Sequence, residues 1–448
     1  MTQALDALTA QLLNAAKAAG ADSADAMATR GTSVSVDVRA GALEEAQREE
    51  GADIGLRVFV GKRTAIVSAS DLSQRTMTEM AERAVAMALE APENPYAGLA
   101  DPDEIASDWD AAALELFDPT PEPAPEALQQ DAAEAEAAAR AVDGTSQIDA
   151  ASAGYSAYDV HMAGSNGFSG GYRRSSRGLS CVAIAGSGTQ MERDYDSDSR
   201  VFQSDLRAPS DIGRTAAERT LLRRDPRKPP TGTYPVLFDE RVATSLIGHL
   251  LGAINGSAIT RGASFLRDCM DQQVLPDGLS LIEDPHRPRL GSSRPFDAEF
   301  LPTAKRTIVE NGYLRSWTLD LGTGRQLGLA STANAGRGVS SGPSPSSAGI
   351  ALTQGTQSRD DLIRDMGTGL LVTSMIGSTI NPNTGDYSRG AAGLWVENGE
   401  ITYAVNECTI AGNLRDMLLA IIPANDARTH LSRVVPSLLV PAMTIAGS

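Results

Sequence analysis

The sequence predicts an α+β protein of two domains: an N-terminal α/β domain with an antiparallel sheet and helices over residues 1–225, and a mainly antiparallel, β-rich domain over 231–448. Three observations predict this class. Apolar residues recur at helical spacing near the start, strand-like alternation follows soon afterwards, and two Asn-Gly dipeptides separate β-prone runs in the second half. With 448 residues, of which 42% are apolar and 21% charged, the chain is long enough for more than one core.

The first elements of the N-terminal domain follow from the period of the apolar residues. Residues 3–19 carry leucines at helical spacing, which predicts an amphipathic helix. Valines alternate over 34–38, and residues 53–60 and 64–69 are β-prone runs around a Gly-Lys dipeptide, so a strand and then a strand pair are expected. A further helix is predicted from about 71 to 89.

An acidic, proline-rich connector is predicted at about residues 92–126, inside the N-terminal domain. Residues 101–150 hold 14 acidic residues and a single basic one, Arg140, so most of the net charge of −18 lies in this segment. Prolines interspersed with acidic residues favour an exposed, solvated spacer over a packed element. An alanine- and glutamate-rich helix is expected to follow at about 126–142.

The rest of the N-terminal domain is expected to be rich in strands. Glycine- and serine-rich turns punctuate residues 150–205, which predicts a series of short strands. Residues 211–223 have a helical pattern, and the basic, proline-containing stretch 224–230 is typical of a hinge. The domain boundary is therefore placed at this hinge.

The C-terminal domain is predicted to open with a strand at 234–238 and a helix from 240 to about 254. Strands punctuated by glycine are expected beyond that helix. Asn311-Gly312 and Asn398-Gly399 each lie between β-prone runs, and Asn-Gly provides the two positive φ values that a type I′ turn needs. Each dipeptide therefore predicts a β-hairpin.

Charge and composition exclude several classes of partner. A net charge of −18 repels phosphate backbones and anionic lipid headgroups, so no nucleic-acid or membrane partner is expected. The cysteines, Cys181, Cys269 and Cys408, lie far apart and are expected to be reduced, buried thiols. The start does not resemble a secretory signal and no apolar run is long enough to cross a membrane, so the expected location is cytoplasmic.

Spacing alone predicts no catalytic or metal-binding constellation. The histidines, His161, His249, His286 and His430, are isolated from other metal ligands, whereas a zinc site needs ligands that converge. His249, in the middle of a predicted helix, is expected to be a packed or partly exposed residue. Ser169 fits the pattern G-x-S-x-G, but its polar surroundings are typical of a β-turn, not of the strand-to-helix elbow that a nucleophile needs.

One segment differs in kind, because it crowds polar side chains between two glycines just before an apolar strand. This segment, Gly385–Gly390 with its approach from Pro382, offers hydrogen-bond donors and a cation to a peptide backbone or carboxylate. We select it as a candidate peptide- or partner-contacting loop, with the alternative that its Asp and Arg brace a connection within the fold. The candidate residues are Asn383, Asp386, Tyr387, Ser388 and Arg389.

Four longer stretches carry a more specific signal. They begin at Gly55-Leu-Arg-Val-Phe-Val-Gly-Lys-Arg-Thr, Tyr234-Pro-Val-Leu-Phe-Asp, Gly367-Thr-Gly-Leu-Leu-Val-Thr and Gly385-Asp-Tyr-Ser-Arg-Gly. Together they resemble the TldE (PmbA) branch of the TldD/TldE metallopeptidase family. The resemblance implies a two-domain fold with an α/β N-terminal part and a β-rich C-terminal part. It also implies pairing with a TldD-like chain, in a complex that cleaves unfolded or short peptides.

The resemblance further implies where a metal would lie. In the TldD branch a helix carries His-Glu-x-x-x-His, whose histidines bind zinc while the glutamate acts as general base, and a later cysteine is a further ligand. When Arg261-Gly-Ala-Ser-Phe sets the register, the three helix positions fall on Ile247, Gly248 and Gly252, which cannot bind zinc or polarise a water. The neighbours of Cys408 follow the TldE pattern. No metal or catalytic residue is therefore carried over, and zinc is expected in the TldD-like partner.

The resulting expectation is a non-zinc, TldE-like subunit of a heteromeric TldD/TldE-type metalloprotease, inactive alone, with a peptide substrate and a TldD-like zinc subunit as partner. In isolation the chain is a candidate homodimer. The alternative is a self-associating peptide-binding scaffold without a protease partner. Independent hydrolysis through Ser169 or His249 is a third hypothesis, and it requires activity that survives chelation.

Overall fold

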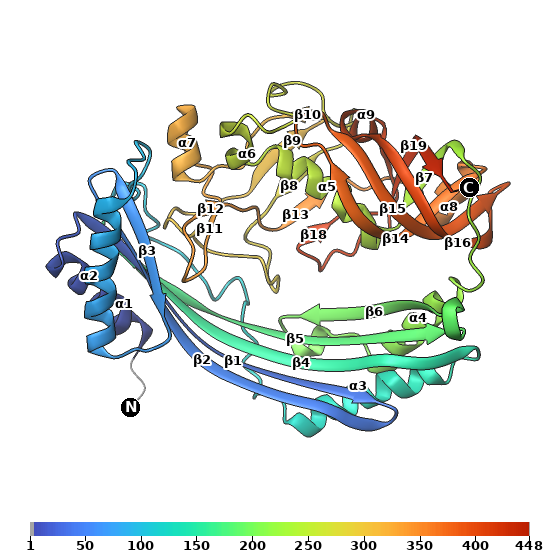
Figure 1. The fold of residues 1–448 in the computed structure, drawn as a ribbon, viewed down its shortest axis with the longest axis horizontal. Coiled ribbons are helices and arrows are strands. Elements are labelled where there is room, and N and C mark those ends of the chain that lie inside the picture. The colour runs from blue at the N-terminus through green and yellow to red at the C-terminus, as the bar shows by residue number, and fades with distance from the viewer. Residues whose placement is uncertain (1–3, 448) are drawn as a thin grey trace.

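The N-terminal part of the chain forms one long antiparallel sheet with the strand order β3-β2-β1-β4-β5-β6. The structure is a computed structural model that describes residues 4–447, except for the side chain of Ser378. Figure 1 shows this sheet as a curved blade beneath the C-terminal part of the chain. Its strands are β1 (Ser23–Arg39), β2 (Ala42–Val60), β3 (Arg63–Ala69), β4 (Thr145–Gly164), β5 (Ser169–Ala185) and β6 (Glu192–Arg200).

Helices cover one face of this sheet. They are α1 (Leu5–Ala18), α2 (Gln74–Glu90), α3 (Pro125–Arg140) and α4 (Pro209–Leu221). In β1, Ala28 lies in the core beneath α1 and α2, and Val34 lies in the core beneath α3 and α4. Side chains alternate along a strand, so the odd-numbered residues of β1, including Asp25 and Met27, lie on the opposite face. That face is turned toward the C-terminal part, whose Arg337 contacts Asp25.

A second six-stranded sheet, with the order β16-β15-β14-β7-β19-β17, organises the C-terminal part. Its strands are β7 (Gly232–Phe238), β14 (Gly369–Ile380), β15 (Asp386–Glu397), β16 (Glu400–Asn413), β17 (Ile422–Pro423) and β19 (Leu438–Ala446). The helices here are α5 (Glu240–Ala253), α6 (Gly256–Thr260), α7 (Leu321–Leu327), α8 (Arg359–Asp365) and α9 (Leu414–Ala420). Apolar side chains of α5 share one core with β7, β14 and β15.

A smaller sheet, β10-β9-β8-β13-β18, completes the C-terminal part beside a two-stranded ribbon, β11-β12. These short strands are β8 (Leu281–Glu283), β9 (Arg306–Glu310), β10 (Tyr313–Leu314), β11 (Ala335–Gly336), β12 (Ser344–Pro345), β13 (Ile350–Leu352) and β18 (Arg433–Val434). Long loops connect them, and several of these loops face the N-terminal sheet (Figure 1). The predicted α+β class is confirmed.

The two hairpins predicted from Asn-Gly are confirmed. In the β9–β10 turn Asn311 and Gly312 have φ of 48° and 91°, and in the β15–β16 turn Asn398 and Gly399 have φ of 53° and 80°. Both central residues of each turn therefore occupy the left-handed region that Asn-Gly tolerates best. The predicted helices at 71–89 and 240–254 also form, each begun by a side-chain cap from the residue just before it.

The prediction of short strands over residues 150–205 is wrong. The strands β4, β5 and β6 run for 20, 17 and 9 residues. Glycines here lie inside strands and do not end them: Gly154 of β4 is directly opposite Gly178 of β5. The buried guanidinium of Arg177 donates to the Gly154 carbonyl at 2.9 Å.

The acidic segment predicted as an exposed spacer is partly buried, so that prediction needs correction. Trp109 packs against the rings of Phe168 and Phe296, and the backbone N–H of Ala106 donates to the Phe300 carbonyl at 2.7 Å. Leu116 is also buried. The segment therefore runs through the junction between the two parts of the molecule. Its abundant acidic residues hid the few apolar ones that anchor it.

The structure also bears on two predictions made from composition. Along residues 4–447 no helix combines the length and apolar character needed to span a bilayer. All three cysteines are free and buried, as predicted.

Candidate functional site

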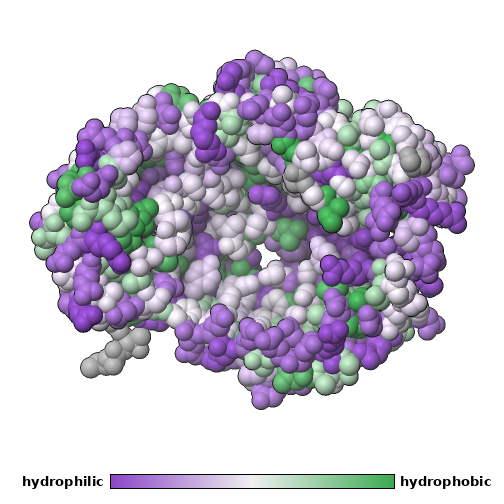
Figure 2. Space-filling model, viewed as in Figure 1, coloured by the Kyte–Doolittle hydropathy of each residue, from purple (hydrophilic) through white to green (hydrophobic). Residues whose placement is uncertain are grey.

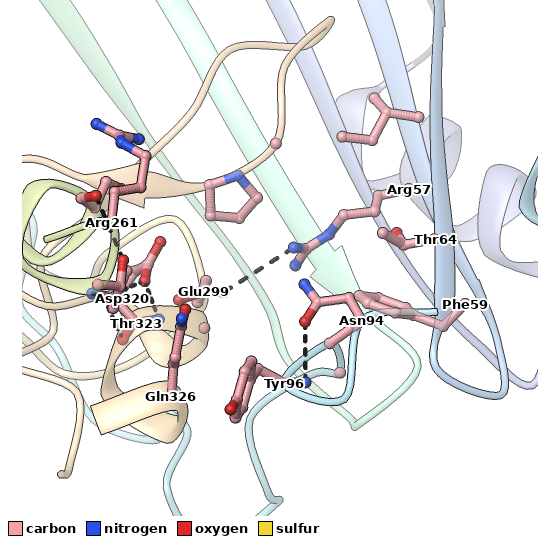
Figure 3. A pocket seen from close by; sticks show the side chains of 18 residues that line it. Arg57, Phe59, Thr64, Asn94, Tyr96, Arg261, Glu299, Asp320, Thr323 and Gln326 are labelled. Atoms are coloured by element: carbon pink, nitrogen blue, oxygen red, sulfur yellow. Dashed lines mark hydrogen bonds and ion pairs between the residues drawn. The ribbon is translucent and has the colours of Figure 1, made fainter. Parts of the chain in front are cut away.

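A deep recess separates the N-terminal sheet from the C-terminal part (Figure 2). A cavity of about 360 Å³ opens at this junction. Arg57 and Phe59 of β2 lie on one side of it, and Glu299 and Asp320 lie on loops of the C-terminal part on the other (Figure 3). The cavity is therefore built by both halves of the chain and is lined by charged as well as apolar side chains.

A buried ion network anchors this junction. Asp25 of β1 is directly opposite Arg57 of β2, which donates to its carboxylate from Nε at 2.7 Å. Arg337, from a loop of the C-terminal part, donates from Nη1 to the other carboxylate oxygen. Burial alone would raise the pKa of Asp25, but the Arg337 and Arg57 guanidinium groups hold it below its usual value of 3.8. Asp25 is therefore an ionised bridge between the two parts.

Next to this ion network, a loop of the C-terminal part lies so close to β2 that position 55 has no room for a side chain. Gly55, two residues before Arg57 on β2, leaves room for the backbone carbonyl of Val339, which occupies the space where a Cβ would stand. Val339 follows Arg337 in the same loop. The glycine therefore lets this loop lie directly on the sheet.

Glu299 is the most perturbed carboxyl group in the cavity. Only 5% of the residue is exposed. Burial, only partly offset by Arg57, raises its pKa to about 8. One oxygen accepts from the backbone N–H of Leu321 at 2.7 Å, and the other lies 4.0 Å from Nη1 of Arg57. At neutral pH this carboxyl group is protonated, so it can donate a hydrogen bond to a polar ligand in the cavity.

The three α5 positions onto which the zinc motif was expected to fall have no donor side chains. Ile247 is fully buried in the C-terminal core. A Cβ on Gly248 would lie 3.2 Å from the Arg433 guanidinium, and one on Gly252 would meet open space. A hydrocarbon side chain and two hydrogens offer no lone pair to a metal, so these residues do not fit zinc.

His249 lies beside these positions but contacts the core. Its ring meets that of Tyr387 edge-on, with centroids 5.9 Å apart, and its buried Nε2 has no partner within residues 4–447. Burial, with a smaller contribution from Arg389, lowers the pKa of His249, which favours the neutral imidazole at neutral pH.

The five candidate residues of the 383–389 segment differ in exposure: two are exposed, one is buried and two are half-buried. Asn383 is exposed in the turn before β15, and Asp386 accepts hydrogen bonds from Thr384 at 2.6 Å and Asn413 at 3.2 Å. Tyr387 is buried, and burial raises its pKa to about 12.

The other two residues of this segment lie further along β15. Ser388 is half-buried and lies opposite Ala411 of β16. Arg389 donates from Nε to the Gly377 carbonyl at 2.8 Å. These contacts brace the β14–β15 hairpin, and contact with a peptide or partner stays a prediction for all five residues.

Cys408 on β16 is engaged within its own sheet. Its thiol donates to the Ala391 carbonyl at 3.2 Å, and burial raises its pKa to about 11. Across the described part of the chain, no three His, Cys, Asp or Glu side chains converge in the manner of a metal site.

Ser169 is paired with a histidine, which sequence spacing did not show. Its Oγ lies 3.4 Å from Nε2 of His161, whose Nδ1 lies 2.9 Å from the hydroxyl of Thr9. Ser169 is the exposed first residue of β5, so it follows a turn into a strand, as expected. The strand-to-helix elbow of a serine hydrolase is not formed at this residue.

Sequence reasoning missed the ionisable residues of the junction. Asp25, Arg57, Glu299 and Arg337 come from four separate segments, and their convergence depends on strand register and on the docking of two loops. One signal was present: Arg57 interrupts the apolar run 54–60, where a charged side chain requires a buried partner.

Three domain descriptions of the PmbA/TldA metallopeptidases match the chain. Domain 1 matches residues 24–88, the central domain matches residues 118–224, and the C-terminal domain matches residues 231–447.

Individual relatives match over nearly the full length. Metalloprotease PmbA of Escherichia coli is 39% identical over 428 residues, which cover 95% of this chain and 92% of the relative. The Haemophilus influenzae homologue of PmbA is 37% identical, with the same shares covered. The crystal structure of TldE from Thermococcus kodakarensis is 20% identical with a TM-score of 0.86, over 98% of this chain and all of that one, which shows a shared fold. The chain therefore belongs to the TldD/TldE metallopeptidase family, in its PmbA/TldE branch.

Proposed function

We propose that this chain is the non-zinc, TldE-like subunit of a heteromeric TldD/TldE-type metalloprotease that degrades or processes unfolded and short peptides in the cytoplasm. The proposal rests on the side chains at three positions of α5. Ile247, Gly248 and Gly252 stand where the zinc ligands and the general base of the TldD branch would fall, and none has a side chain that can serve. The hydrolytic zinc then belongs to a TldD-like partner.

The junction cavity supports a role in holding peptides. β3 is the last strand of its sheet, and its residues Thr64 and Ile66 line the cavity. An edge strand can pair with the backbone of an extended peptide whatever the peptide's sequence. Arg57 and the protonated Glu299 stand close enough to meet further polar groups of such a peptide (Figure 3).

The isolated chain provides the first arm of the test. Purified alone, it is expected to hydrolyse no unfolded peptide substrate. Co-expressed with a TldD-like chain that carries His-Glu-x-x-x-His, it should co-elute with that chain in size-exclusion chromatography, and the complex should show chelator-sensitive peptidase activity.

Two outcomes would contradict the proposal. Peptidase activity of the isolated chain that survives chelation would assign hydrolysis to this chain. Failure to bind any chain with the zinc motif, together with peptide binding by a self-associated form, would favour the scaffold. A Gly248→Ala variant is a control for α5 packing, since it adds only a methyl group beside Arg433 and should leave the complex active.

A further inference from the structure

The cavity of Figure 3 contains side-chain atoms that are open to it and make no hydrogen bond. Nε and Nη2 of Arg57 face Asp25, whereas Nη1 lies 4.0 Å from Oε1 of Glu299, too far for a hydrogen bond. The Arg57 side chain keeps 9% of its accessible surface. Neither Nη1 nor Oε1 belongs to the enclosed, unpartnered atoms of residues 4–447. Both atoms can therefore contact a ligand in this cavity, whose volume of about 360 Å³ is typical of ligand sites.

Asn94 adds a donor to the same space. It is exposed and lies in the loop that follows α2. Its Oδ1 accepts from the backbone N–H of Tyr96 at 3.1 Å, so its Nδ2 is the atom that can donate into the cavity. In Figure 3 the side chains of Arg57 and Asn94 point toward Glu299 from the opposite side. Because Glu299 is protonated at neutral pH, all three side chains offer a donor to the space between them.

The charges around this space leave a positive excess. The carboxylate of Asp25 is shared by two guanidinium groups, of which it can neutralise one. In the lining, Asp320 is held at the start of α7, where its Oδ1 accepts from the backbone N–H of Thr323 at 2.8 Å and from its hydroxyl at 2.6 Å. Arg261 also lines the cavity, and its charge offsets that of Asp320. An acceptor with a negative charge therefore suits both the donors and the charge of this cavity.

Apolar surface lies beside these donors. Phe59 and Ile66 line the cavity from the N-terminal sheet, and Tyr96 and Pro343 line it from loops. A bare inorganic anion would leave this surface without a partner, whereas a peptide places hydrocarbon next to each of its carboxylates. Such a carboxylate belongs either to the last residue of the peptide or to an aspartate or glutamate side chain.

We propose that this cavity binds the carboxylate of a short peptide, between the donors of Arg57 and Asn94 on one side and the carboxyl group of Glu299 on the other. The inference rests on the proposed function, since it names the group by which this subunit holds a peptide. The edge strand β3 borders the cavity, so residues next to a bound carboxylate can pair with its backbone.

The test is calorimetric binding of short peptides to the isolated full-length chain. Acetyl-alanyl-leucine offers a terminal carboxylate, acetyl-alanyl-glutamate α-amide offers a side-chain carboxylate, and acetyl-alanyl-leucine amide offers neither. Near neutral pH at least one acid should bind about tenfold or more tightly than the neutral amide, and the tighter acid identifies the source of the carboxylate. Inorganic phosphate and alanyl-leucine amide, which has a free amine, are the competing probes.

Glu299 should give the binding a distinctive pH dependence. With a pKa of about 8 it loses its proton between about pH 7 and about pH 9, so the acid should bind about tenfold more weakly at the higher pH. The charged groups that face it are Arg57 on β2, Asp297 in its own loop and Asp320 at the start of α7, and the other titratable groups of the lining are Tyr96 and Arg261. All of these remain in Glu299→Gln, whose amide donates at either pH, so its affinity for the acid should stay nearly constant.

Two further substitutions test the donors. Arg57→Lys keeps a cation for Asp25 but has no second nitrogen for the cavity, so it should weaken binding of the acid about tenfold or more. Asn94→Ala changes an exposed position and should weaken acid binding at least about threefold. The matched controls are Arg177→Lys, at a buried arginine paired with an aspartate, and Asn425→Ala, at an exposed asparagine bonded to a backbone carbonyl. Neither control residue lines the cavity, so both variants should bind the acid as the unmodified chain does.

Several outcomes would overturn the inference. Equal binding of the acids and the neutral amide would do so, as would tighter binding of phosphate or of the free amine. A loss of affinity at high pH that is the same in Glu299→Gln would also contradict it. If Arg57→Lys fails to fold, Asn94→Ala decides, and unchanged acid binding would refute the assignment. Because these measurements use the isolated chain, they are separate from the co-elution and activity that test the proposed function.

Discussion

Replacing Glu299 by Gln should remove a large pH dependence from the stability of this protein. In the unfolded chain the Glu299 carboxyl ionises around its usual pKa of 4.5, whereas in the folded chain burial raises that pKa to about 8. Between these values the folded chain keeps a proton that the unfolded chain releases. Raising the pH therefore favours unfolding, and stability is lost progressively from about pH 4.5 to about pH 8.

The size of the effect follows from the same two pKa values. Each unit of pKa difference between folded and unfolded chains corresponds to about 1.4 kcal/mol, so the full window is worth at most about 5 kcal/mol. Gln is similar in shape and cannot ionise. The free energy of unfolding of Glu299→Gln should therefore fall less between about pH 5 and about pH 8 than that of the unmodified chain.

Urea unfolding followed by tryptophan fluorescence provides the assay, since Trp109 lies at the same junction. The exposed Glu90, at the end of α2, supplies a control: Glu90→Gln should parallel the unmodified chain at every pH. A difference between Glu299→Gln and the unmodified chain that stays constant across the window would refute the reasoning, because it would mean that Glu299 ionises alike in both states.

Three further predictions concern the junction and the serine. Gly55→Ala should destabilise the chain by about 1–3 kcal/mol in urea unfolding, since its Cβ would strike the Val339 carbonyl. Asp25→Asn should cost about 3–5 kcal/mol near neutral pH, because it leaves two buried guanidinium groups without a carboxylate. That cost should shrink in acid, as the carboxylate of the unmodified chain is protonated below its lowered pKa. Ser169→Ala should leave the chelator-sensitive peptidase activity of the complex unchanged.

Each of these three predictions would be contradicted by a specific result. A fully stable Gly55→Ala chain would show that the Val339 loop is not held against β2. An Asp25→Asn penalty that stays the same from neutral to acid pH would remove the assigned role of the ionised carboxylate. Loss of activity in folded Ser169→Ala would revive the hypothesis of independent serine chemistry.

Elements whose conformation depends on one or two adjacent residues could be predicted from the sequence. Asn311-Gly312 and Asn398-Gly399 form their hairpins because few other dipeptides tolerate two successive positive φ values. The prediction of short strands over residues 150–205 was wrong because several glycines there lie inside strands and do not form turns. In β4 and β5, Gly154 and Gly178 stand opposite each other inside long strands, a pairing set by strand register that no local pattern reveals.

The ion pairs at the junction could not be predicted from local sequence patterns, for a different reason. Asp25 meets Arg57 through the register of β1 and β2, and it meets Arg337 only because a loop more than 300 residues later docks on the sheet. The acidic segment was misjudged for a related reason: composition reports the solvated majority of its residues, whereas Trp109 determines where the segment packs.

Metal analysis of the purified chain, alone and in complex, tests the central claim most directly. The isolated chain should contain substoichiometric zinc, because the α5 positions at Ile247, Gly248 and Gly252 have no ligand to offer. Zinc should become stoichiometric once a TldD-like chain has bound. Zinc near one equivalent in the isolated chain, retained after dialysis against a weak chelator, would contradict the assignment of a non-zinc subunit.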